Sequence, residues 1–362
     1  MLIWLRKMRN NFSGFVFNQF KKNEERLHDL TYLFWECTRR CSLRCLHCGS
    51  DCSAGSETAD MPFDDFLRAI LPLGEAYGKD SITVAVTGGE PLLRKDLADC
   101  GVKLRENGFR WGIVTNGYDY TRDIHGRLLA AGMGSVTISL DGLEQSHNWL
   151  RADSHSFQRA VNAVDLISLS SRLYYDVVTC VNQKNIDELE KLKDLLAERG
   201  VKAWRLFTIS PIGRAASNGI LRLTPAQLKT LMEFIAVSRN DARIDVSFSC
   251  EAYLGKYENK VRNNPFFCRA GINIGSVLAD GSISACPNID RSFIQGNIYT
   301  DNFLNVWENR FTVMRDRRWT KTGLCKNCDA YKNCKGGAMH MWNGKKDSIM
   351  SCVYDQLNTA ET

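Results

Sequence analysis

Short runs with strand character alternate with helical patterns along residues 31–209 of this 362-residue chain. The strand-like runs are rich in β-branched and aromatic residues and cover residues 31–38, 81–87, 109–115, 134–140, 173–181 and 202–209. Apolar residues recur at helical spacing between them, over residues 63–77, 96–107, 123–132, 156–170 and 186–199. Alternation of this kind is typical of right-handed βαβ units. It predicts a parallel α/β sheet, open or curved into a partial barrel.

Composition and charge narrow the class of protein. Hydrophobic residues make up 44% and charged residues 24% of the chain, as in an ordinary soluble globular protein. The net charge of +6 is spread along the sequence, so no nucleic-acid partner is indicated. The apolar run MLIWL at residues 1–5 is too short for a signal-peptide core or a membrane span. We therefore expect a cytoplasmic protein without a membrane partner.

The 14 cysteines fall into two groups on either side of a cysteine-poor body. Five lie between residues 37 and 52, three are scattered at residues 100, 180 and 250, and six lie between residues 268 and 352. Reducing conditions in the cytoplasm disfavour structural disulfides, so this number indicates metal or redox use. Cys100 and Cys180 lie within helix and strand patterns, and we interpret both as small core residues.

Four short motifs follow the first four strand-like runs. CSLRCLHC (residues 41–48) follows the first, GGEP (88–91) the second and TNG (115–117) the third, while SLDG (139–142) closes the fourth. In parallel α/β architectures, ligands bind beyond the carboxyl ends of the strands. The four motifs are therefore expected to meet on one face around a shared ligand.

The first motif holds three cysteines in C-x3-C-x2-C spacing, at Cys41, Cys45 and Cys48. Cysteine thiolates bind iron–sulfur clusters, and a cubane held by three of them leaves the fourth position of one iron open. The alternative is a zinc site, which usually needs four protein ligands and would have to recruit Cys37, Cys52 or His47.

With these motifs, residues 31–209 resemble the radical S-adenosylmethionine (SAM) superfamily, whose C-x3-C-x-aromatic-C motif has His47 at the aromatic place. The resemblance implies a partial (β/α)6 TIM-like barrel. It implies that Cys41, Cys45 and Cys48 hold a [4Fe-4S] cluster, and that SAM chelates its open iron. A reductant such as flavodoxin or ferredoxin would supply the electron that cleaves SAM to a 5'-deoxyadenosyl radical, which abstracts hydrogen from a substrate.

The resemblance also assigns residues to the cofactor. The GGEP segment would receive the methionine amino group, with Glu90 suited to the ammonium and Gly88 and Gly89 allowing close approach. The residues expected near the ribose and carboxylate are Ser139 and Asp141, with Arg151 pairing to the carboxylate. Two further candidates are Asn116 and Leu206. Cys37 and Cys52 are expected not to be ligands, because the motif is complete without them.

The second cysteine group resembles the SPASM extension of radical SAM enzymes over about residues 266–354. The resemblance implies an auxiliary iron–sulfur cluster, expected to be [4Fe-4S], on Cys325, Cys328, Cys334 and Cys352. A first auxiliary cluster would use Cys268 and Cys286, but Ala338 replaces a cysteine of the family pattern. Its other donors would be His340, Cys250, solvent or substrate, or the cluster is absent. A four-cysteine zinc ribbon at residues 325–352 is the structural alternative.

These assignments divide the chain into an N-terminal extension (1–30), a radical SAM barrel (31–221), a helical bridge (222–262) and a cysteine-rich α+β SPASM domain (263–362). The extension is expected to add a short helix or strand that closes part of the barrel. In the bridge, we expect Thr224 to be a helix N-cap and Pro225 to be the first helical residue.

SPASM enzymes usually modify peptides, so the resemblance implies hydrogen abstraction from a peptide, encoded near its gene, for crosslinking, oxidation or epimerisation. Sulfatase maturation is disfavoured, because Pro287 stands where those enzymes have an aspartate. The enzymatic alternative is biosynthesis of a tetrapyrrole or a peptide-derived cofactor. A non-enzymatic alternative is an iron–sulfur or zinc protein that acts as a scaffold or electron carrier.

Overall fold

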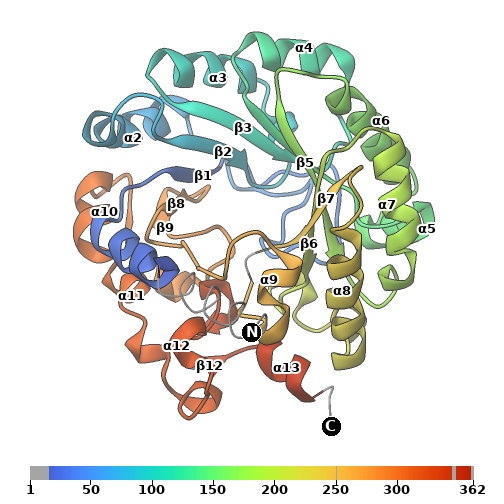
Figure 1. The fold of residues 1–362 in the computed structure, drawn as a ribbon. Helices are drawn as coiled ribbons and strands as arrows, with labels where there is room; N and C mark the ends of the chain where they lie inside the picture. Colours follow the sequence, from blue (N-terminus) through green and yellow to red (C-terminus); the bar gives the residue numbers. More distant parts are fainter. Residues whose placement is uncertain (1–15, 250, 345–347, 360–362) are drawn as a thin grey trace.

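The computed structural model describes residues 16–249, 251–344 and 348–359, and its strands curve around a central axis with helices outside (Figure 1). The strands of the barrel are β1 (Tyr32–Glu36), β2 (Thr83–Thr87), β3 (Arg110–Thr115), β4 (Ser135–Ser139), β5 (Tyr174–Val181), β6 (Ala203–Thr208) and β7 (Asp245–Phe248). The helices that alternate with them are α2 (Phe63–Tyr77), α3 (Leu97–Glu106), α4 (Arg122–Ala130), α5 (Glu144–Arg151), α6 (Ser156–Ser168), α7 (Leu189–Glu198) and α8 (Pro225–Ser238). The predicted βα alternation is confirmed.

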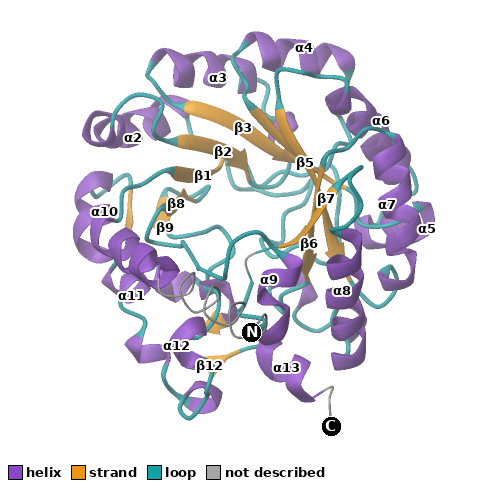
Figure 2. Cartoon of the chain, in the orientation of Figure 1, coloured by secondary structure: helices purple, strands orange, loops and turns teal. Residues whose placement is uncertain are grey.

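Each strand from β1 to β7 pairs in parallel with the next. Their carboxyl ends therefore lie at one rim of the barrel. Figure 2 shows the helices as an outer ring and the strands as an inner one. This is the predicted partial barrel, with β7 as a strand that the sequence analysis missed. The bridge over residues 222–262 is thus not helical throughout, because β7 lies within it. Only four residues form β7, too few for a clear period-2 pattern.

The two faces of the sheet have different roles. Along β6, Trp204 and Leu206 are fully buried, and the Trp204 ring lies 6.0 Å from that of Phe234 on α8. Side chains alternate across a strand, so Arg205 and Phe207 point to the opposite, inner face of the barrel. The main apolar core lies between the strands and the helices, while the inner face is left for partly exposed and polar residues.

Local sequence explains where several helices begin and end. The side chain of Thr224 accepts a hydrogen bond from Gln227 N, and Gln227 completes a capping box with Pro225 at the first turn of α8. The predicted N-cap is confirmed. Several helices end at a glycine, since Gly108, Gly132 and Gly200 all adopt positive φ just after helices.

The C-terminal part adds to the same sheet. Strand β8 (Ile274–Val277) pairs in parallel with β1, and β9 (Ser282–Ser284) and β10 (Gly296–Asn297) continue outward in antiparallel pairing. The remaining elements are α9 (Glu258–Val261), α10 (Phe303–Arg310), α11 (Thr312–Arg315), α12 (Tyr331–Cys334), β11 (Trp342–Asn343), β12 (Ser348–Ile349) and α13 (Val353–Thr359). The edge of the barrel at β1 is therefore covered by C-terminal residues.

A helix over residues 16–27 packs against the C-terminal part (Figure 1). The Phe20 and Phe267 rings lie 6.4 Å apart, and Glu25 pairs with Lys335 at 3.1 Å. Of the short helix or strand expected for the extension, the structure forms a helix, and the contacts named here are made to the cysteine-rich region. Residues 1–5, with the MLIWL run, lie outside the described residues.

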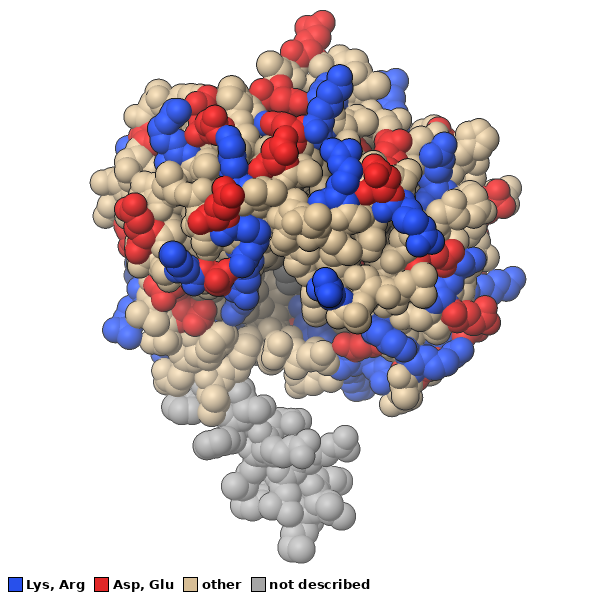
Figure 3. Space-filling model, turned by 90° about the horizontal axis from the view of Figure 1, so that it is seen from above, with Lys and Arg blue, Asp and Glu red and all other residues tan. Residues whose placement is uncertain are grey.

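Within the described ranges, no helix has both the length and the apolar character needed to span a bilayer. On the face shown in Figure 3, basic and acidic side chains are intermixed rather than grouped by sign. That face lacks the continuous basic stripe that a nucleic-acid backbone prefers.

Candidate active site

The loop after β1 brings the first three cysteines together. Cys41 and Cys45 are buried, Cys48 is partly buried, and all three belong to one small cluster that also contains Cys52. Cys37 instead lies fully buried in the main core beneath the loop. Three thiols of the C-x3-C-x2-C motif in one buried group fit the donor set of an iron–sulfur cluster.

Each of these sulfur atoms accepts a hydrogen bond. Asn116 Nδ2 donates to Cys41 Sγ at 3.8 Å, and Arg151 Nη1 donates to Cys45 Sγ at 3.7 Å. The backbone N–H of Cys52 donates to Cys48 Sγ at 3.4 Å. Hydrogen bonds to the sulfur ligands help to set the reduction potential of an iron–sulfur cluster. Asn116 and Arg151 are therefore placed to influence the potential of a cluster bound here.

The free thiols differ in acidity. Burial raises the pKa of Cys41 to about 12 and also raises the pKa of Cys45, where Arg151 acts in the opposite direction. A hydrogen bond from Cys52 lowers the pKa of Cys48 to about 6. Cys48 is thus the thiol most readily ionised, and its neighbour Cys52 stays protonated as the donor.

A turn after β6 braces the cysteine loop from outside. Arg214 Nε donates to Cys45 O at 2.7 Å, and Arg214 Nη1 donates to Cys52 O at 2.9 Å. Gly213 has φ 53°, and a Cβ there would lie 2.4 Å from the carbonyl oxygens of Cys48 and Gly49. Sequence reasoning missed this brace, because a Gly-Arg pair in a loop carries no distinctive signal on its own.

The GGEP loop lies against the cysteine loop backbone. Gly89 N donates to Thr38 O and Glu90 N donates to Arg40 O, each at 2.8 Å. A Cβ on Gly88 would lie 2.3 Å from Thr38 O, and one on Gly89 would lie 2.1 Å from Arg40 O. Both positions need glycine so that two backbones can approach closely.

The side chain of Glu90 is fully buried and turned toward the end of β3. Its carboxylate accepts hydrogen bonds from Leu92 N at 3.1 Å, Thr115 Oγ1 at 2.7 Å and Asn116 N at 2.9 Å. Burial raises the pKa of Glu90 to about 7, and these donors act in the opposite direction. Glu90 therefore holds the TNG turn, and through it Asn116, beside Cys41.

Asp141 and Arg151 form a buried ion pair at the end of β4. Asp141 Oδ2 lies 2.6 Å from the Arg151 guanidinium, and Cys180 N donates to Asp141 Oδ1 at 2.8 Å. Burial alone would raise the pKa of Asp141, but Arg151 holds it below its ordinary value. A guanidinium fixed in this way stays charged and directed at Cys45.

His47 lies in the same region. Its side chain, that of Asp141 and the thiol of Cys180 place their ligand atoms within 4.8 Å of one another. Burial lowers the pKa of His47 to about 4, and its Nδ1 has no hydrogen-bond partner. Cys180 is partly buried on the inner face of β5, where it packs against a small apolar cluster with Leu150 and Ile209, while Cys100 lies in the main core.

The remaining cofactor candidates are placed differently. Ser139 ends β4 on the partly exposed inner face. Leu206 is fully buried in the core between the sheet and the helices, so the structure does not bring its side chain to the site.

The second cysteine group forms a pocket of its own. Cys325, Cys328, Cys334 and Cys352 all line one cavity of about 350 Å³ at α12 and the start of α13. Cys325 is buried and the other three are partly buried. Thiols converging on one cavity from four separate points of the chain fit an auxiliary cluster.

Cys268 and Cys286 lie in apolar surroundings and are partly buried. Ala338 packs in a small apolar cluster with Phe266 and Met341, and Cys268 lies at the edge of this cluster. Cys268 and Cys286 both also pack against the main core. Cys250 lies outside the described residues. Burial lowers the pKa of His340 to about 4.

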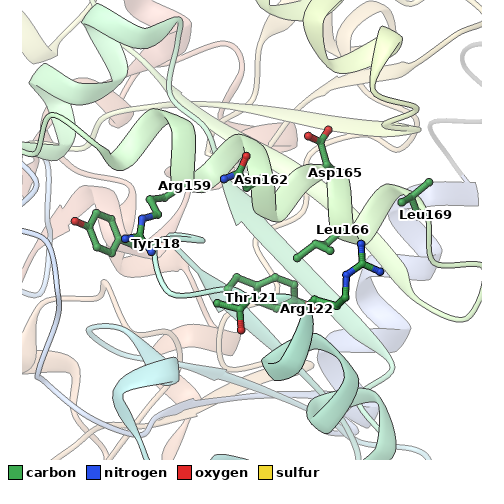
Figure 4. Close-up of a pocket in the computed structure, with 9 residues that line it drawn as sticks. Tyr118, Thr121, Arg122, Arg159, Asn162, Asp165, Leu166 and Leu169 are labelled. Carbon is green, nitrogen blue, oxygen red and sulfur yellow. The ribbon is translucent and has the colours of Figure 1, made fainter.

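A separate surface pocket of about 350 Å³ lies between α4 and α6 (Figure 4). Arg159 stands over the Tyr118 ring at 5.1 Å, and Arg122 lies toward the other end of the pocket. Tyr118 also packs against the cluster of Cys41 and its neighbours. The pocket thus touches the back of the cysteine loop.

Comparison with known proteins identifies the class. The family model described as the Radical SAM superfamily matches residues 35–196, and the SPASM model, described as an iron-sulfur cluster-binding domain, matches residues 268–329. The AdoMet-dependent heme synthase of Methanosarcina barkeri is 24% identical over 344 residues, covering 88% of this chain and 95% of the relative. The mycofactocin maturase MftC of Mycolicibacterium smegmatis is 28% identical over 314 residues, covering 85% and 77%.

The fold has solved counterparts. Streptococcus suis SuiB bound to precursor peptide SuiA aligns with a TM-score of 0.67 and 18% identity, over 85% of this chain and 71% of that chain. The chain therefore shares this α/β barrel fold. The two family-model matches identify it as an iron–sulfur enzyme. It belongs to the radical SAM superfamily and carries a SPASM domain. That membership implies a [4Fe-4S] cluster, bound SAM and an auxiliary iron–sulfur cluster. The two sets of cysteines described above, one in the loop after β1 and one in the C-terminal cavity, suit these clusters.

Proposed function

We propose that this enzyme binds SAM beyond the carboxyl ends of β1 to β4 and abstracts hydrogen from a peptide. The observation that carries the proposal is the arrangement around Cys45: a buried Arg151, paired with Asp141, lies 3.7 Å from the Cys45 sulfur. A fixed guanidinium next to a cluster ligand suits the carboxylate of SAM. When bound, the reduced cluster and SAM supply the 5'-deoxyadenosyl radical that takes the hydrogen.

The chain's own residues would bind and orient these groups. Cys41, Cys45 and Cys48 are the proposed cluster ligands, with Asn116 and Arg151 donating to two of the sulfurs. The GGEP backbone would lie along the methionine amino group, and Ser139 would face the ribose. The four cysteines of the C-terminal cavity are the proposed ligands of the auxiliary cluster.

The peptide assignment is supported by the SPASM resemblance and by the likeness to SuiB, whose structure contains a precursor peptide. The maturase MftC, at 28% identity, is consistent with it. The second candidate, tetrapyrrole biosynthesis, is favoured by one observation, the 24% identity to a heme synthase over 95% of that relative. The two candidates share the radical chemistry and differ in the substrate.

The proposed SAM chemistry is tested with a triple variant. Replacing Cys41, Cys45 and Cys48 with alanine should abolish 5'-deoxyadenosine formation under dithionite, because the thiolate ligands are lost. Cys100→Ala is the matched control, since Cys100 is a buried thiol that lies in the main core and outside the motif. It should keep its iron and its activity. Equal cleavage by the wild type and the triple variant would refute the assignment.

The substrate is tested by hydrogen transfer. The reduced enzyme and SAM are incubated with peptides encoded beside its gene, or with iron coproporphyrin as the tetrapyrrole arm. Deuterium moving from a labelled peptide into 5'-deoxyadenosine, with a change in peptide mass, supports the peptide assignment. Transfer from the porphyrin alone would replace it with the second candidate.

A further inference from the structure

The surface pocket between α4 and α6 carries two charged side chains that the proposed SAM site does not use. Arg159 stands over the Tyr118 ring at 5.1 Å, and Arg122 lies near Leu166 and Leu169 at the other end of the pocket (Figure 4). Both arginines are exposed. In the part of the chain that the structure describes, neither of their side chains forms an ion pair or a hydrogen bond. Two guanidinium groups therefore face the solvent from one pocket.

The carboxylates in and around the pocket do not cancel this charge. Asp165 lines the pocket, but both of its carboxylate oxygens accept hydrogen bonds from Arg199, at 2.7 and 2.8 Å. Asp123, in the first turn of α4, pairs with Arg127 at 3.9 Å. Asp119, in the loop before α4, is not one of the residues that line the pocket. The pocket therefore keeps an excess of positive charge, which favours an anionic partner.

The pocket also lies next to the proposed cluster ligands. Tyr118 forms part of its wall and packs against the buried group that contains Cys41, Cys45 and Cys52. Tyr118 N donates to Asn116 Oδ1 at 2.8 Å, and Asn116 Nδ2 in turn donates to Cys41 Sγ. One residue, Tyr118, thus lies between the pocket and the thiols.

This position is suited to the entry of electrons. The proposed reaction consumes one electron for each SAM that is cleaved, and a donor outside the chain must deliver it. Complexes between electron-transfer proteins are small, often burying less than about 1,200 Å² in total, and opposite charges steer the partners together. The two arginines supply the charge, and Leu169, which is 81% exposed, adds apolar surface at the edge of the pocket.

We infer that the pocket of Arg122, Arg159 and Tyr118 is the docking surface for an acidic protein that carries one electron. The inference rests on the proposed function, because it takes the cluster on the three cysteines of the loop after β1 to be the electron acceptor. In the docked complex the reduced carrier loses one electron and the oxidised cluster gains it. No covalent bond forms or breaks in this step, and no proton is transferred.

The test measures binding of an oxidised flavodoxin, an acidic one-electron carrier, to the anaerobically reconstituted full chain with SAM. The wild type should bind it at low ionic strength and more weakly as salt is added, because added ions screen the charges. The double variant Arg122→Glu with Arg159→Glu should bind it more weakly by on the order of tenfold. Isothermal titration calorimetry gives the dissociation constants.

The matched control is Arg68→Glu with Arg110→Glu, which has the same net charge as the test variant. The side chain of Arg68 on α2 is 75% exposed, and Arg110 is exposed at the amino end of β3, at the opposite end of the barrel from the cysteine loop. This control should keep most of the wild-type affinity for flavodoxin. Iron content and circular dichroism confirm that each variant is folded.

The rate of SAM cleavage separates docking from damage to the cluster. With dithionite, a small reductant that needs no docking surface, the double glutamate variant should release 5'-deoxyadenosine at the wild-type rate. With reduced flavodoxin at a subsaturating concentration, its rate should fall by on the order of tenfold. If this variant does not fold, Arg122→Gln with Arg159→Gln takes its place and must show a smaller loss in the same direction.

Three binding results overturn the inference: equal affinity in the wild type and the double variant, no binding by the wild type, or an equal loss in the matched control. An equal loss of rate with both reductants also overturns it, since the defect would then lie in the cluster. Failure of the proposed function would appear separately, as a wild type that releases no 5'-deoxyadenosine with dithionite. Binding is measured without turnover and still reports on the docking surface in that case.

Discussion

At the scale of single residues, the carboxylate of Glu90 shows how a motif residue acts through its neighbours. It accepts hydrogen bonds from Leu92, Thr115 and Asn116, all belonging to the protein itself. Asn116 in turn donates to Cys41. Glu90 is therefore a positioning residue for the cysteine loop in this structure, and its proposed contact with the SAM ammonium stays a prediction.

Glu90→Ala should weaken SAM binding with nearly unchanged iron content. It leaves buried donors on Thr115 and Asn116 without an acceptor, which costs on the order of 2 kcal/mol of stability. SAM affinity from equilibrium dialysis and the midpoint of thermal unfolding check both effects. Glu75→Ala, at an exposed position on α2, is the control. Wild-type SAM affinity in Glu90→Ala would contradict the role given to this residue.

Glu251 makes a pH-dependent contribution to stability. Its buried carboxylate accepts hydrogen bonds from Thr208 N at 2.9 Å and from the Thr208 hydroxyl, and burial raises its pKa from 4.5 to about 7. The folded protein thus favours the protonated form. The stability it confers is present below about pH 4.5, is lost as the pH rises toward 7, and stays lost above that.

Glu251→Gln should therefore unfold at a higher temperature than the wild type at pH 8, and the difference should shrink toward pH 5. Between pH 8 and pH 5, the raised pKa of Glu251 changes its contribution to the free energy of unfolding by on the order of 2 kcal/mol. Anaerobic melting curves at several pH values measure it, with Glu75→Gln as the control. A constant difference across this range would show that Glu251 does not titrate as described.

At the scale of elements, the short C-terminal helices decide how many clusters the chain holds. α12 and α13 bring Cys334 and Cys352 to the cavity that Cys325 and Cys328 also line. Ala338 is buried among Phe266 and Met341, so an apolar cluster lies where the family pattern has another thiol. We therefore expect one auxiliary cluster rather than two.

The reconstituted chain should hold about eight irons, with about four in each of two clusters. Cys334→Ala should lower the count to about four, because the auxiliary cluster loses a ligand. Cys286→Ala should leave it near eight, and this variant serves as the control. Iron and sulfide analysis with EPR spectroscopy gives the counts. About twelve irons in the wild type, or a loss of iron in Cys286→Ala, would show that a first auxiliary cluster forms.

At the scale of the whole molecule, the barrel and the cysteine-rich region share one sheet. β8 pairs with β1 through Tyr32 to Trp35, and Trp307 Nε1 donates to His28 O at 2.9 Å just before β1. The N-terminal helix adds the Glu25–Lys335 pair. Consequently the C-terminal region covers a sheet edge that the barrel would otherwise expose.

A chain ending at residue 262 should form soluble aggregates or precipitate, because β1 becomes an unpaired edge strand. Size-exclusion chromatography with light scattering measures the outcome. The control is the full chain with Cys325, Cys328, Cys334 and Cys352 changed to serine, which loses the cluster ligands but keeps β8. A larger fraction of this variant than of the truncated chain should stay monodisperse. A monodisperse truncated chain would mean that β8 is dispensable for the barrel.

The sequence by itself determined the local features. Runs of β-branched and aromatic residues placed β1 to β6, and helical spacing of apolar residues placed the helices between them, within a few residues, because both patterns are local. The spacing of Cys41, Cys45 and Cys48 predicted a thiolate site, since these three cysteines are near neighbours along the chain.

The tertiary structure decided which distant groups meet. Nothing local in the sequence indicates that Glu90 turns to Thr115, that Arg214 braces Cys45, or that Leu206 faces the helices while Arg205 faces inward beside Asp176. β7 escaped prediction because four residues carry too little pattern, yet pairing with β6 is enough to form it. These contacts arise from strand order and register, which depend on residues far apart in the chain.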